Sequence, residues 1–428
     1  MVSPARSSLR TPAGLLAAGV TALCLGVAGW LFVRYPGVLV SGVANPNPTG
    51  HVDFETFWRS TSALLHGQDL YQTGSVLKNL NPPFLSLLLA PFGLLPVMLS
   101  YWLFTALSVV LAVGTVLVSA RELRLSRRVT VFAVVTLLAS SPLHGTLLLG
   151  QIYVLLMAGL AGAWLAARRG RPGYAAVLVA LVVALKPSLA PLLLVPLCWR
   201  GHPARWSSVL IGVSATAGFT LVGVLIAGPA SAVDWLRLAT GTPAPEFDAN
   251  ASVPGVLARL GAPAVLGWVV TVVVVLGTLW WVRRTHDVGR TPPGVVGSAD
   301  TVWFAVAAGC LLASPIAWLN YGVLLWPGVL VLLRAGRWWA AVPLLTASII
   351  PVAWANLWQA APHTPAALIG RSLYCWILLG FWIALSAYSR NPGSEAARAE
   401  PGPADVVRPD RREAEEDSDV AWSATRAD

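Results

Sequence analysis

The chain has 428 residues, of which 56% are hydrophobic and 11% are charged, and its formal net charge is +10. This composition excludes an ordinary soluble domain and predicts an all-α protein that crosses a membrane many times. Ten of the nineteen acidic residues follow Ser394, so only nine carboxylates serve the rest of the chain. Each of those nine is a candidate functional group, because charged side chains are costly inside membranes.

Six apolar segments have about 20 residues, the length that spans a bilayer as a helix. They are residues 15–33, 99–118, 208–227, 265–282, 340–358 and 368–387. Residues 129–149 and 151–167 form a further pair folded at Gly150, with a kink expected at Ser141-Pro142. The apolar run of the first segment exceeds that of a signal peptide, so we expect an uncleaved anchor.

Two longer apolar stretches, 174–199 and 302–333, are divided by a charge argument. A hairpin broken at Lys186-Pro187 puts every strongly basic connector on one side, which the positive-inside rule assigns to the cytoplasm. We divide the second stretch in the same way at Ser314-Pro315. About twelve transmembrane helices result, in the plasma membrane and with both termini cytoplasmic. The positive charge thus indicates topology, and binding of nucleic acid is not expected. The basic connectors carry Arg121, Arg124, Arg127, Arg128, Arg168, Arg169, Arg171, Arg200, Arg205, Arg283, Arg284, Arg290, Arg334 and Arg337.

The two ends of the chain and its cysteines indicate its organisation. Residues 1–12 are expected to be a cytoplasmic N-terminus, residues 13–390 the membrane domain, and residues 391–428, rich in Pro, Glu, Asp, Arg and Ala, a disordered cytoplasmic tail. The four cysteines lie far apart in apolar segments, so we interpret them as core residues rather than metal ligands or disulfide partners.

Topology sorts the nine carboxylates. Glu122, Asp287 and Asp300 fall in cytoplasmic connectors, where a solvated role is expected. The other six fall in two outer loops, residues 34–81 and 228–261, so the functional face is expected to be extracytoplasmic. These six are Asp53, Glu55, Asp69, Asp234, Glu246 and Asp248.

The first outer loop contains a helical pattern. Apolar residues recur from Phe54 to Leu65 at helical spacing, and Gly67 ends the pattern. We predict an amphipathic helix at the membrane interface, with Asp53 as its N-cap. Asp53 then either only caps this helix or has a chemical role. The following apolar run, 84–95, is too short to cross and is expected to be re-entrant or interfacial.

Four polar residues interrupt apolar segments near their outer ends: Gln151, Lys186, Asn320 and Tyr321. Lys186 is one of only two lysines in the chain. A lysine at this depth needs an anionic partner, either a phosphate or, within the protein, a carboxylate or helix-end carbonyls. Gln151 fits a hydrogen bond between helices as well as a ligand contact.

Short motifs occur in order over about residues 13–390. They are Asp53-Phe54 with Trp58, Gly67-Gln68-Asp69-Leu70-Tyr71, Asn81-Pro82-Pro83-Phe84, Pro91-Phe92, Gly150-Gln151, Lys186-Pro187, Asn250-Ala251-Ser252 with Gly255 and Arg259, and Ser314-Pro315 with Trp318. As an ordered set they resemble the polyprenol-phosphate-sugar-dependent glycosyltransferases of actinobacterial envelopes. That group contains α-mannosyltransferases that extend phosphatidylinositol mannosides and lipomannan, and related arabinofuranosyltransferases.

The resemblance implies a GT-C fold with an extracytoplasmic active site and an aspartate of the first outer loop, here Asp53, as catalytic base. A departing lipid phosphate needs cations, and we assign Lys186 and Arg259 to it, followed by Arg237 and Lys78. Relatives often have histidine after Ser-Pro-x-x-Trp and tyrosine before the double proline, where this chain has Asn320-Tyr321 and Asn81. Residues expected to line the substrate cavity are Glu55, Trp58, Tyr71, Asn81, Gln151, Asn250, Ser252, Trp318, Asn320 and Tyr321.

The sequence therefore predicts transfer of a sugar, mannose first, from a polyprenyl-phosphate donor to a glycolipid or lipoglycan acceptor among the membrane lipids. Arabinofuranose transfer is the alternative within the family, and lipid or solute transport the alternative outside it. Transport is less favoured because the outer carboxylates lie in loops and no repeated halves are evident. No cofactor and no dedicated metal site are expected, since the outer loops lack an Asp-x-Asp pair, although single carboxylates remain able to share a divalent cation with the phosphate.

Overall fold

The computed structural model describes residues 11–35, 51–199, 203–285, 296–297, 299–358 and 364–388. Contacts divide the chain into two units, Met1–Ser389 and Arg390–Asp428. The expected tail, residues 391–428, lies outside the described residues. The described part is helical, and Asn250 and Trp318 form an isolated β-bridge in it. The all-α prediction is confirmed.

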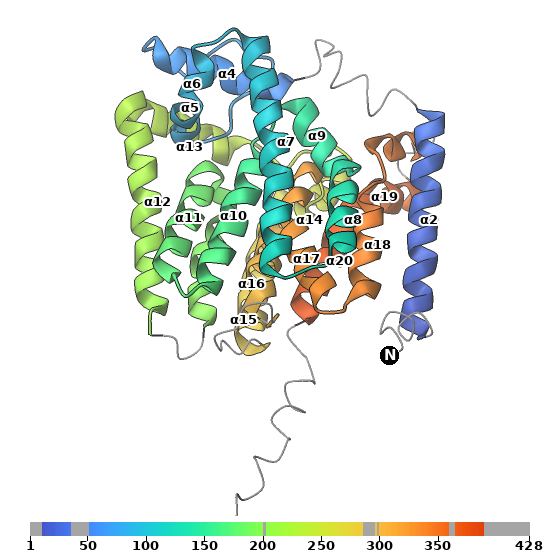
Figure 1. The fold of residues 1–428 in the computed structure, drawn as a ribbon. Helices are drawn as coiled ribbons and strands as arrows, with labels where there is room; N and C mark the ends of the chain where they lie inside the picture. Colours follow the sequence, from blue (N-terminus) through green and yellow to red (C-terminus); the bar gives the residue numbers. More distant parts are fainter. Residues whose placement is uncertain are drawn as a thin grey trace, which may run out of the picture. The chain divides into compact units, whose positions relative to one another are not determined.

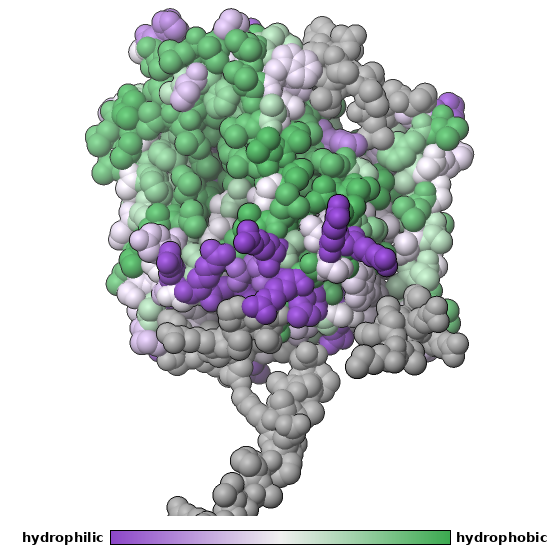
Figure 2. All heavy atoms as spheres, in the orientation of Figure 1, coloured by the Kyte–Doolittle hydropathy of each residue, from purple (hydrophilic) through white to green (hydrophobic). Residues whose placement is uncertain are grey.

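Among the described residues, four helices are long and apolar enough to cross a membrane: α2 (Pro12–Arg34), α7 (Val97–Glu122), α12 (Arg205–Ala227) and α15 (Ala264–Thr285). Each matches a predicted segment and runs along the height of the bundle in Figure 1. Most of their residues are not buried in the protein; in α15 the share buried is 11%. Figure 2 shows the apolar surface that results, which suits a lipid environment.

Three further apolar pairs are bent. The helices α8 (Arg127–Leu138) and α9 (Ser141–Leu149) meet at 49°, which confirms the kink expected at Ser141-Pro142. The pair α18 (Trp338–Ala347) and η4 (Val352–Trp358) is bent by 73°, and the pair α19 (Pro365–Arg371) and α20 (Leu373–Ala387) by 59°. The segments predicted as ordinary spans at 340–358 and 368–387 are therefore bent pairs, each of which is a broken span or a re-entrant loop.

Each break has an identifiable cause. Pro351 precedes η4, and proline supplies no N–H donor and disfavours helix in the residue before it. At the other break, the Trp354 indole N–H donates to the Gly370 carbonyl at 2.7 Å. That carbonyl would otherwise accept a hydrogen bond within a continuous helix. Both causes depend on single residues inside apolar runs.

The hairpin predicted at Lys186-Pro187 is confirmed. The helix α10 (Tyr153–Arg168) is followed by α11 (Pro172–Leu185) and by the 3₁₀ helix η2 (Pro187–Cys198). A Cβ added at Gly212 of α12 would lie 3.0 Å from the Leu193 side chain and 3.6 Å from the Ala176 carbonyl, so η2 returns alongside α11. Prolines starting and interrupting η2 remove the donors of a regular α-helix, which suits a 3₁₀ path. Lys186 lies at the tip.

The second predicted division is also confirmed. After α16 (Ala299–Ala313) the chain turns at Ser314-Pro315 and returns as η3 (Leu319–Leu325) and α17 (Trp326–Arg334). A Cβ added at Gly328 of α17 would lie 2.6 Å from Phe304, which places the first half of α16 beside the first turn of α17. The helices α10, α11, η2, α16 and η3 with α17 are 10–17 residues long. By length, the described part of the chain has four spans, or up to seven with the bent pairs, so twelve are not confirmed.

One end of the bundle carries short helices between the spans, and Figure 1 shows α4–α6 at its top. They are α4 (Val52–Leu65), α5 (Pro83–Leu88), α6 (Ala90–Gly93), α13 (Pro229–Gly241) and α14 (Val253–Arg259). The predicted helix after Asp53 is confirmed as α4. Gly67, at φ +66°, and Gln68 donate to Leu64 and Ala63 carbonyls in a Schellman ending. The apolar run 84–95 forms α5 and α6 instead of one helix.

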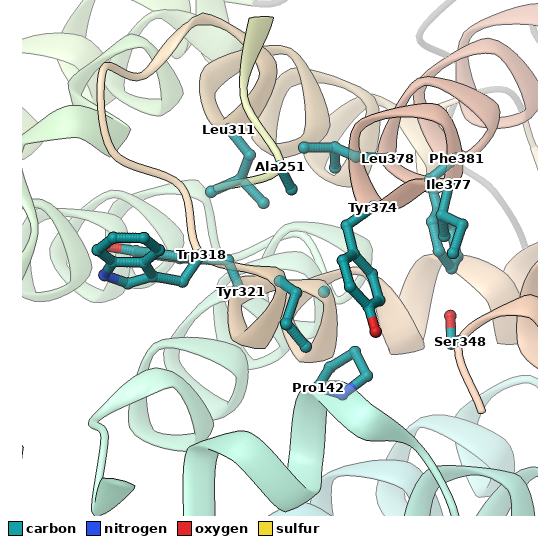
Figure 3. A pocket seen from close by; sticks show the side chains of 12 residues that line it. Pro142, Ala251, Leu311, Trp318, Tyr321, Ser348, Tyr374, Ile377, Leu378 and Phe381 are labelled. Carbon is teal, nitrogen blue, oxygen red and sulfur yellow. The ribbon is translucent and has the colours of Figure 1, made fainter. Parts of the chain in front are cut away.

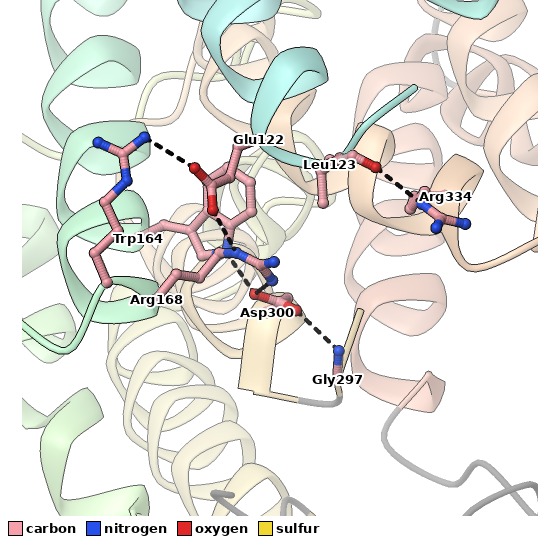
Figure 4. Close-up of polar contacts among 8 residues, drawn as sticks. Glu122, Leu123, Trp164, Arg168, Gly297, Asp300 and Arg334 are labelled. Carbon is pink, nitrogen blue, oxygen red and sulfur yellow. Dashed lines mark hydrogen bonds and ion pairs between the residues drawn. The ribbon is translucent and has the colours of Figure 1, made fainter. Parts of the chain in front are cut away.

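The opposite end contains a buried charge cluster, shown in Figure 4. Arg168 Nη1 lies 2.5 Å from Asp300 and Arg168 Nε lies 3.4 Å from Glu122, and the Trp164 indole also donates to Asp300. Asp300 is only 2% exposed. The solvated role predicted for Glu122 and Asp300 was therefore wrong, because both carboxylates join helices α7, α10 and α16. Asp287 lies outside the described residues.

Candidate active site

The start of α4 is fixed to the turn between α9 and α10. Gly150 ends α9 at φ +67°, and a Cβ there would lie 2.4 Å from that of Phe54, so only glycine permits this approach. The His51 backbone N–H donates to the Leu148 carbonyl at 2.8 Å. The Tyr101 hydroxyl donates to the Leu147 and Leu148 carbonyls. This docking brings Asp53 beside Gln151.

Asp53 is the second residue of α4 and lies in its first turn, where the helix dipole favours a negative charge. The N-cap is His51, which has the left-handed φ of 53°, so the prediction that Asp53 is the cap was wrong. Gln151 hydrogen-bonds to the Asp53 carboxylate and Lys186 acts on it electrostatically. Burial raises the pKa of Asp53, and the Gln151 bond and the Lys186 charge partly oppose that rise.

Lys186 occupies the junction of α11 and η2. Its Nζ lies 3.5 Å from Asn81 Oδ1 and 5.6 Å from the centroid of the Tyr321 ring. An amide oxygen and an aromatic face both favour a cation. With Asp53, they hold the ammonium of Lys186 next to the first turn of α4.

Asn81 is fixed by its own loop. Its backbone N–H and its Nδ2 donate to Asn79 Oδ1 at 3.0 and 3.2 Å. The Tyr71 hydroxyl donates to the Asn81 carbonyl at 2.9 Å, and the Trp235 indole of α13 donates to the Leu80 carbonyl. These bonds leave the Asn81 side-chain oxygen turned to Lys186. Tyr71 and Asn81 thus lie together.

Tyr321 packs beside Lys186 and Tyr153. Its ring centroid is 3.9 Å from that of Tyr153, the first residue of α10. Asn320, 3% exposed, packs on Gly145, where a Cβ would meet its side-chain oxygen. Sequence reasoning missed Tyr153, although it follows Gln151 by two residues. We call Asp53, Asn81, Gln151, Tyr153, Lys186 and Tyr321 the Asp53 cluster.

Asn250 and Ser252 are fully buried and bind protein groups. Asn250 Oδ1 accepts hydrogen bonds from the Ser252 N–H and hydroxyl and from the Ala317 N–H. Its Nδ2 donates to the Pro245 and Pro315 carbonyls. Asn250 therefore joins the second outer loop to the turn that leads to Trp318, whose ring lies 6.2 Å from that of Phe247.

The other predicted cations and α4 residues have different partners. Arg259 donates to the Phe247 and Asn250 carbonyls and to Ser372. Arg237, with a side chain 77% exposed, lies 3.5 Å from Asp234, and Lys78 is exposed. Glu55 pairs with Arg59 at 2.8 Å, and the Trp58 indole donates to the Leu95 carbonyl.

An apolar cavity adjoins Tyr321, as Figure 3 shows. Its lining includes Trp318, Tyr374 and Pro142, and its free volume is about 20 Å³. A single water needs about 10–15 Å³ on this measure, so the cavity is too small for a sugar.

Comparison with known proteins fits this arrangement. The chain matches glycosyltransferase family 87 over residues 79–315, which is more than half its length and includes Asn81, Gln151 and Lys186. It is 27% identical over 330 residues to the polyprenol-phosphate-mannose-dependent alpha-(1-2)-phosphatidylinositol mannoside mannosyltransferase of Mycolicibacterium smegmatis, covering 68% of this chain and 72% of the relative. The resemblance identified from the motifs is confirmed. The chain belongs to glycosyltransferase family 87 and is a membrane glycosyltransferase.

Proposed function

We propose that this protein transfers mannose from a polyprenyl-phosphate donor to a glycolipid or lipoglycan acceptor at the end of the bundle that carries α4. The observation that carries the proposal is the placement of Asp53 beside Gln151 and Lys186. A base for a hydroxyl and a cation for a phosphate are the two groups that this reaction requires. The name of the Mycolicibacterium smegmatis relative supports mannose as the sugar.

Asp53 is the general base in this proposal. The acceptor hydroxyl attacks the anomeric carbon and its proton passes to the Asp53 carboxylate, while the bond between that carbon and the phosphate oxygen breaks. Both electrons of that bond leave with the polyprenyl phosphate. The raised pKa of Asp53 strengthens it as a base, and the hydrogen bond from Gln151 orients its carboxylate.

Lys186 is the cation that we assign to the leaving phosphate. Its ammonium is held by Asn81 and the Tyr321 ring, so it is positioned before the donor arrives. Arg259 is occupied by two carbonyls and Ser372, and a phosphate would have to compete with them. Arg237 and Lys78 are exposed, so each can contact a lipid phosphate at the surface of the protein.

The α4 end is assigned to the extracytoplasmic side in this proposal, with both termini in the cytoplasm. The basic connectors support this, since Arg168 and Arg334 both lie at the opposite end of the bundle (Figures 1 and 4). Cysteine labelling of intact cells tests it. A cysteine at Val76, which is 86% exposed, should react with an impermeant reagent, and one at Arg124 should react only after lysis. The reverse pattern would contradict the assignment.

Purified protein in proteoliposomes tests the reaction itself. Polyprenyl-phosphate mannose and polyprenyl-phosphate arabinose are offered separately with a phosphatidylinositol mannoside acceptor, and product is measured by mass spectrometry. We expect mannosylated product, including in the presence of a chelator, since we propose no cofactor. Arabinosylated product would indicate the alternative donor. Movement of the donor across the bilayer without any product would indicate a transporter.

A further inference from the structure

A groove lies between α18 and α20, away from the Asp53 cluster. Its free volume is about 290 Å³. On the measure by which a single water needs about 10–15 Å³, the groove has room for roughly twenty waters. The side chains along it are apolar: Trp339, Pro343 and Leu344 from α18, and Ile383, Ala384 and Ala387 from α20.

The helices define the shape of this groove. A Cβ added at Gly380 would lie 2.9 Å from the Leu344 side chain, so α18 and α20 approach closely there and close the deep end. Small residues continue along α20 at Ala384 and Ala387, which leaves the space open toward Tyr388. Residues 337–344 extend roughly 10 Å along α18. A narrow apolar groove of this length fits part of a hydrocarbon chain.

The open end of the groove is basic. The Arg337 guanidinium lies 5.9 Å from the ring centroids of both Trp339 and Tyr388, which orients it at the mouth. Arg334, three residues earlier, donates to the Leu123 carbonyl, so the arginine-rich turn between α7 and α8 adjoins it. Figure 2 shows hydrophilic side chains gathered toward this lower end.

We propose that the groove between α18 and α20 binds an anionic glycerophospholipid, with an acyl chain between the helices and the headgroup phosphate on Arg337. The combination of an apolar groove with a basic mouth matches an amphiphile of negative charge. Basic pockets between transmembrane helices recognise anionic headgroups by charge, and the tryptophan at the mouth suits the headgroup depth. The site lies at the other end of the bundle from Asp53, so it is distinct from the donor and acceptor positions.

Native mass spectrometry of the delipidated full chain tests the proposal. Phosphatidylglycerol and phosphatidylcholine with identical acyl chains are titrated separately. We expect the wild type to bind phosphatidylglycerol at least about tenfold more tightly, the effect of 1.4 kcal/mol. Arg337→Gln should reduce phosphatidylglycerol affinity to that of phosphatidylcholine, and Ala384→Leu should weaken both lipids by filling the groove.

Arg284→Gln is the matched control, because Arg284 also stacks on a tryptophan, Trp280 at 4.4 Å, but belongs to α15 and lies outside the groove. It should bind both lipids as the wild type does. Thermal unfolding shows whether each variant is folded, and Ala387→Leu replaces Ala384→Leu if the latter is not. Wild-type phosphatidylglycerol affinity in Arg337→Gln or in the folded groove-filling variant would overturn the proposal. The proposal would also be overturned if the wild type formed a dimer that the groove-filling variant loses while its lipid binding is unchanged, because the groove would then bind a second copy of the protein.

Discussion

The Lys186 ammonium and the Asn81 side-chain oxygen lie 3.5 Å apart, and each residue directly precedes a proline. Proline restricts the residue before it to extended backbone, and Lys186 has φ −143° and ψ 87°. Lys186-Pro187 ends α11, and Asn81-Pro82 leads into α5. Two helix boundaries therefore set the position of the cation in the Asp53 cluster.

Lys186→Met should weaken use of the lipid donor. The substitution removes a hydrogen-bonding charge worth about 1.5–3 kcal/mol, so donor kcat/KM should fall roughly 10- to 100-fold while the acceptor KM changes little. Steady-state kinetics with the donor varied measures this. Arg237→Met is the comparison, because its side chain is 77% exposed. A larger donor defect in Arg237→Met than in Lys186→Met would move the phosphate assignment to Arg237.

The acidic limb of the pH profile should report Asp53. Burial raises its pKa and the Lys186 charge lowers it, so Lys186→Met should raise that pKa further. The active form is the carboxylate, so the acidic limb of kcat/KM should move to higher pH in this variant. Gln151→Leu should shift it in the same direction by removing a hydrogen bond to the carboxylate. An unmoved limb in both variants would show that Asp53 is not the group that titrates.

Asn250→Ala should destabilise the fold. Three donors, the Ser252 N–H and hydroxyl and the Ala317 N–H, would lose their shared acceptor in a fully buried place. Each buried group without a partner costs about 1–3 kcal/mol, so we expect a clearly lowered unfolding temperature in detergent. Thr240→Ala, on the exposed surface of α13, is the control and should stay within about 0.5 kcal/mol of wild type. Equal unfolding temperatures for the two variants would contradict this role for Asn250.

Asp300→Asn should act on stability and spare the chemistry. It removes the ion pair of Arg168, whose side chain is 4% exposed, while the contact with Glu122 at 3.4 Å stays, so we expect the lower part of the range of about 3–5 kcal/mol for a broken buried pair. Arg169→Gln breaks a pair whose arginine side chain is 58% exposed and should cost about 0–1 kcal/mol. Thermal unfolding compares them. Loss of transfer at a temperature where Asp300→Asn is folded would show that the cluster also serves activity.

Much of the fold follows from local sequence signals. Lys186-Pro187 and Ser314-Pro315 mark the turns of two hairpins, because proline removes a helix donor and charge fixes which connectors share an end. The bend before η4 carries the same proline signal at Pro351 but was predicted as a continuous span, and the bend at Ser372 was not predictable in this way. The second depends on the Trp354 indole reaching the Gly370 carbonyl, a contact between two separate elements. The number of membrane crossings was not predictable either, because several apolar helices are shorter than a full span.

The candidate site was predictable in its residues but less so in its contacts. Gln151, Lys186 and Tyr321 were identified as polar residues near the ends of apolar segments. Asp53 was identified as a carboxylate of the first loop and Asn81 by its motif, and the structure brings the five together. Arg259 and Asn250 share the same motif pattern, yet their partners are backbone carbonyls and amides. The sequence does not distinguish a polar side chain that binds a ligand from one whose hydrogen bonds stabilise a loop. The pairing of Asp300 with Arg168 was missed because hydropathy shows where an apolar segment ends, but not whether a charged residue at that end is buried against another helix.

The most direct test of the proposed chemistry is mannose transfer by Asp53→Asn and Glu55→Gln. Both variants keep side-chain volume and lose one negative charge in the first turn of α4, a change worth about 0.3–1 kcal/mol to the helix, so they are matched in stability. Glu55 pairs with Arg59, away from the Asp53 cluster. We expect Asp53→Asn to lose about 10²- to 10⁴-fold in rate, as removal of a general base does, and Glu55→Gln to remain within a few-fold of wild type. A folded Asp53→Asn protein that transfers mannose at a rate close to wild type would contradict the assignment of Asp53 as the base.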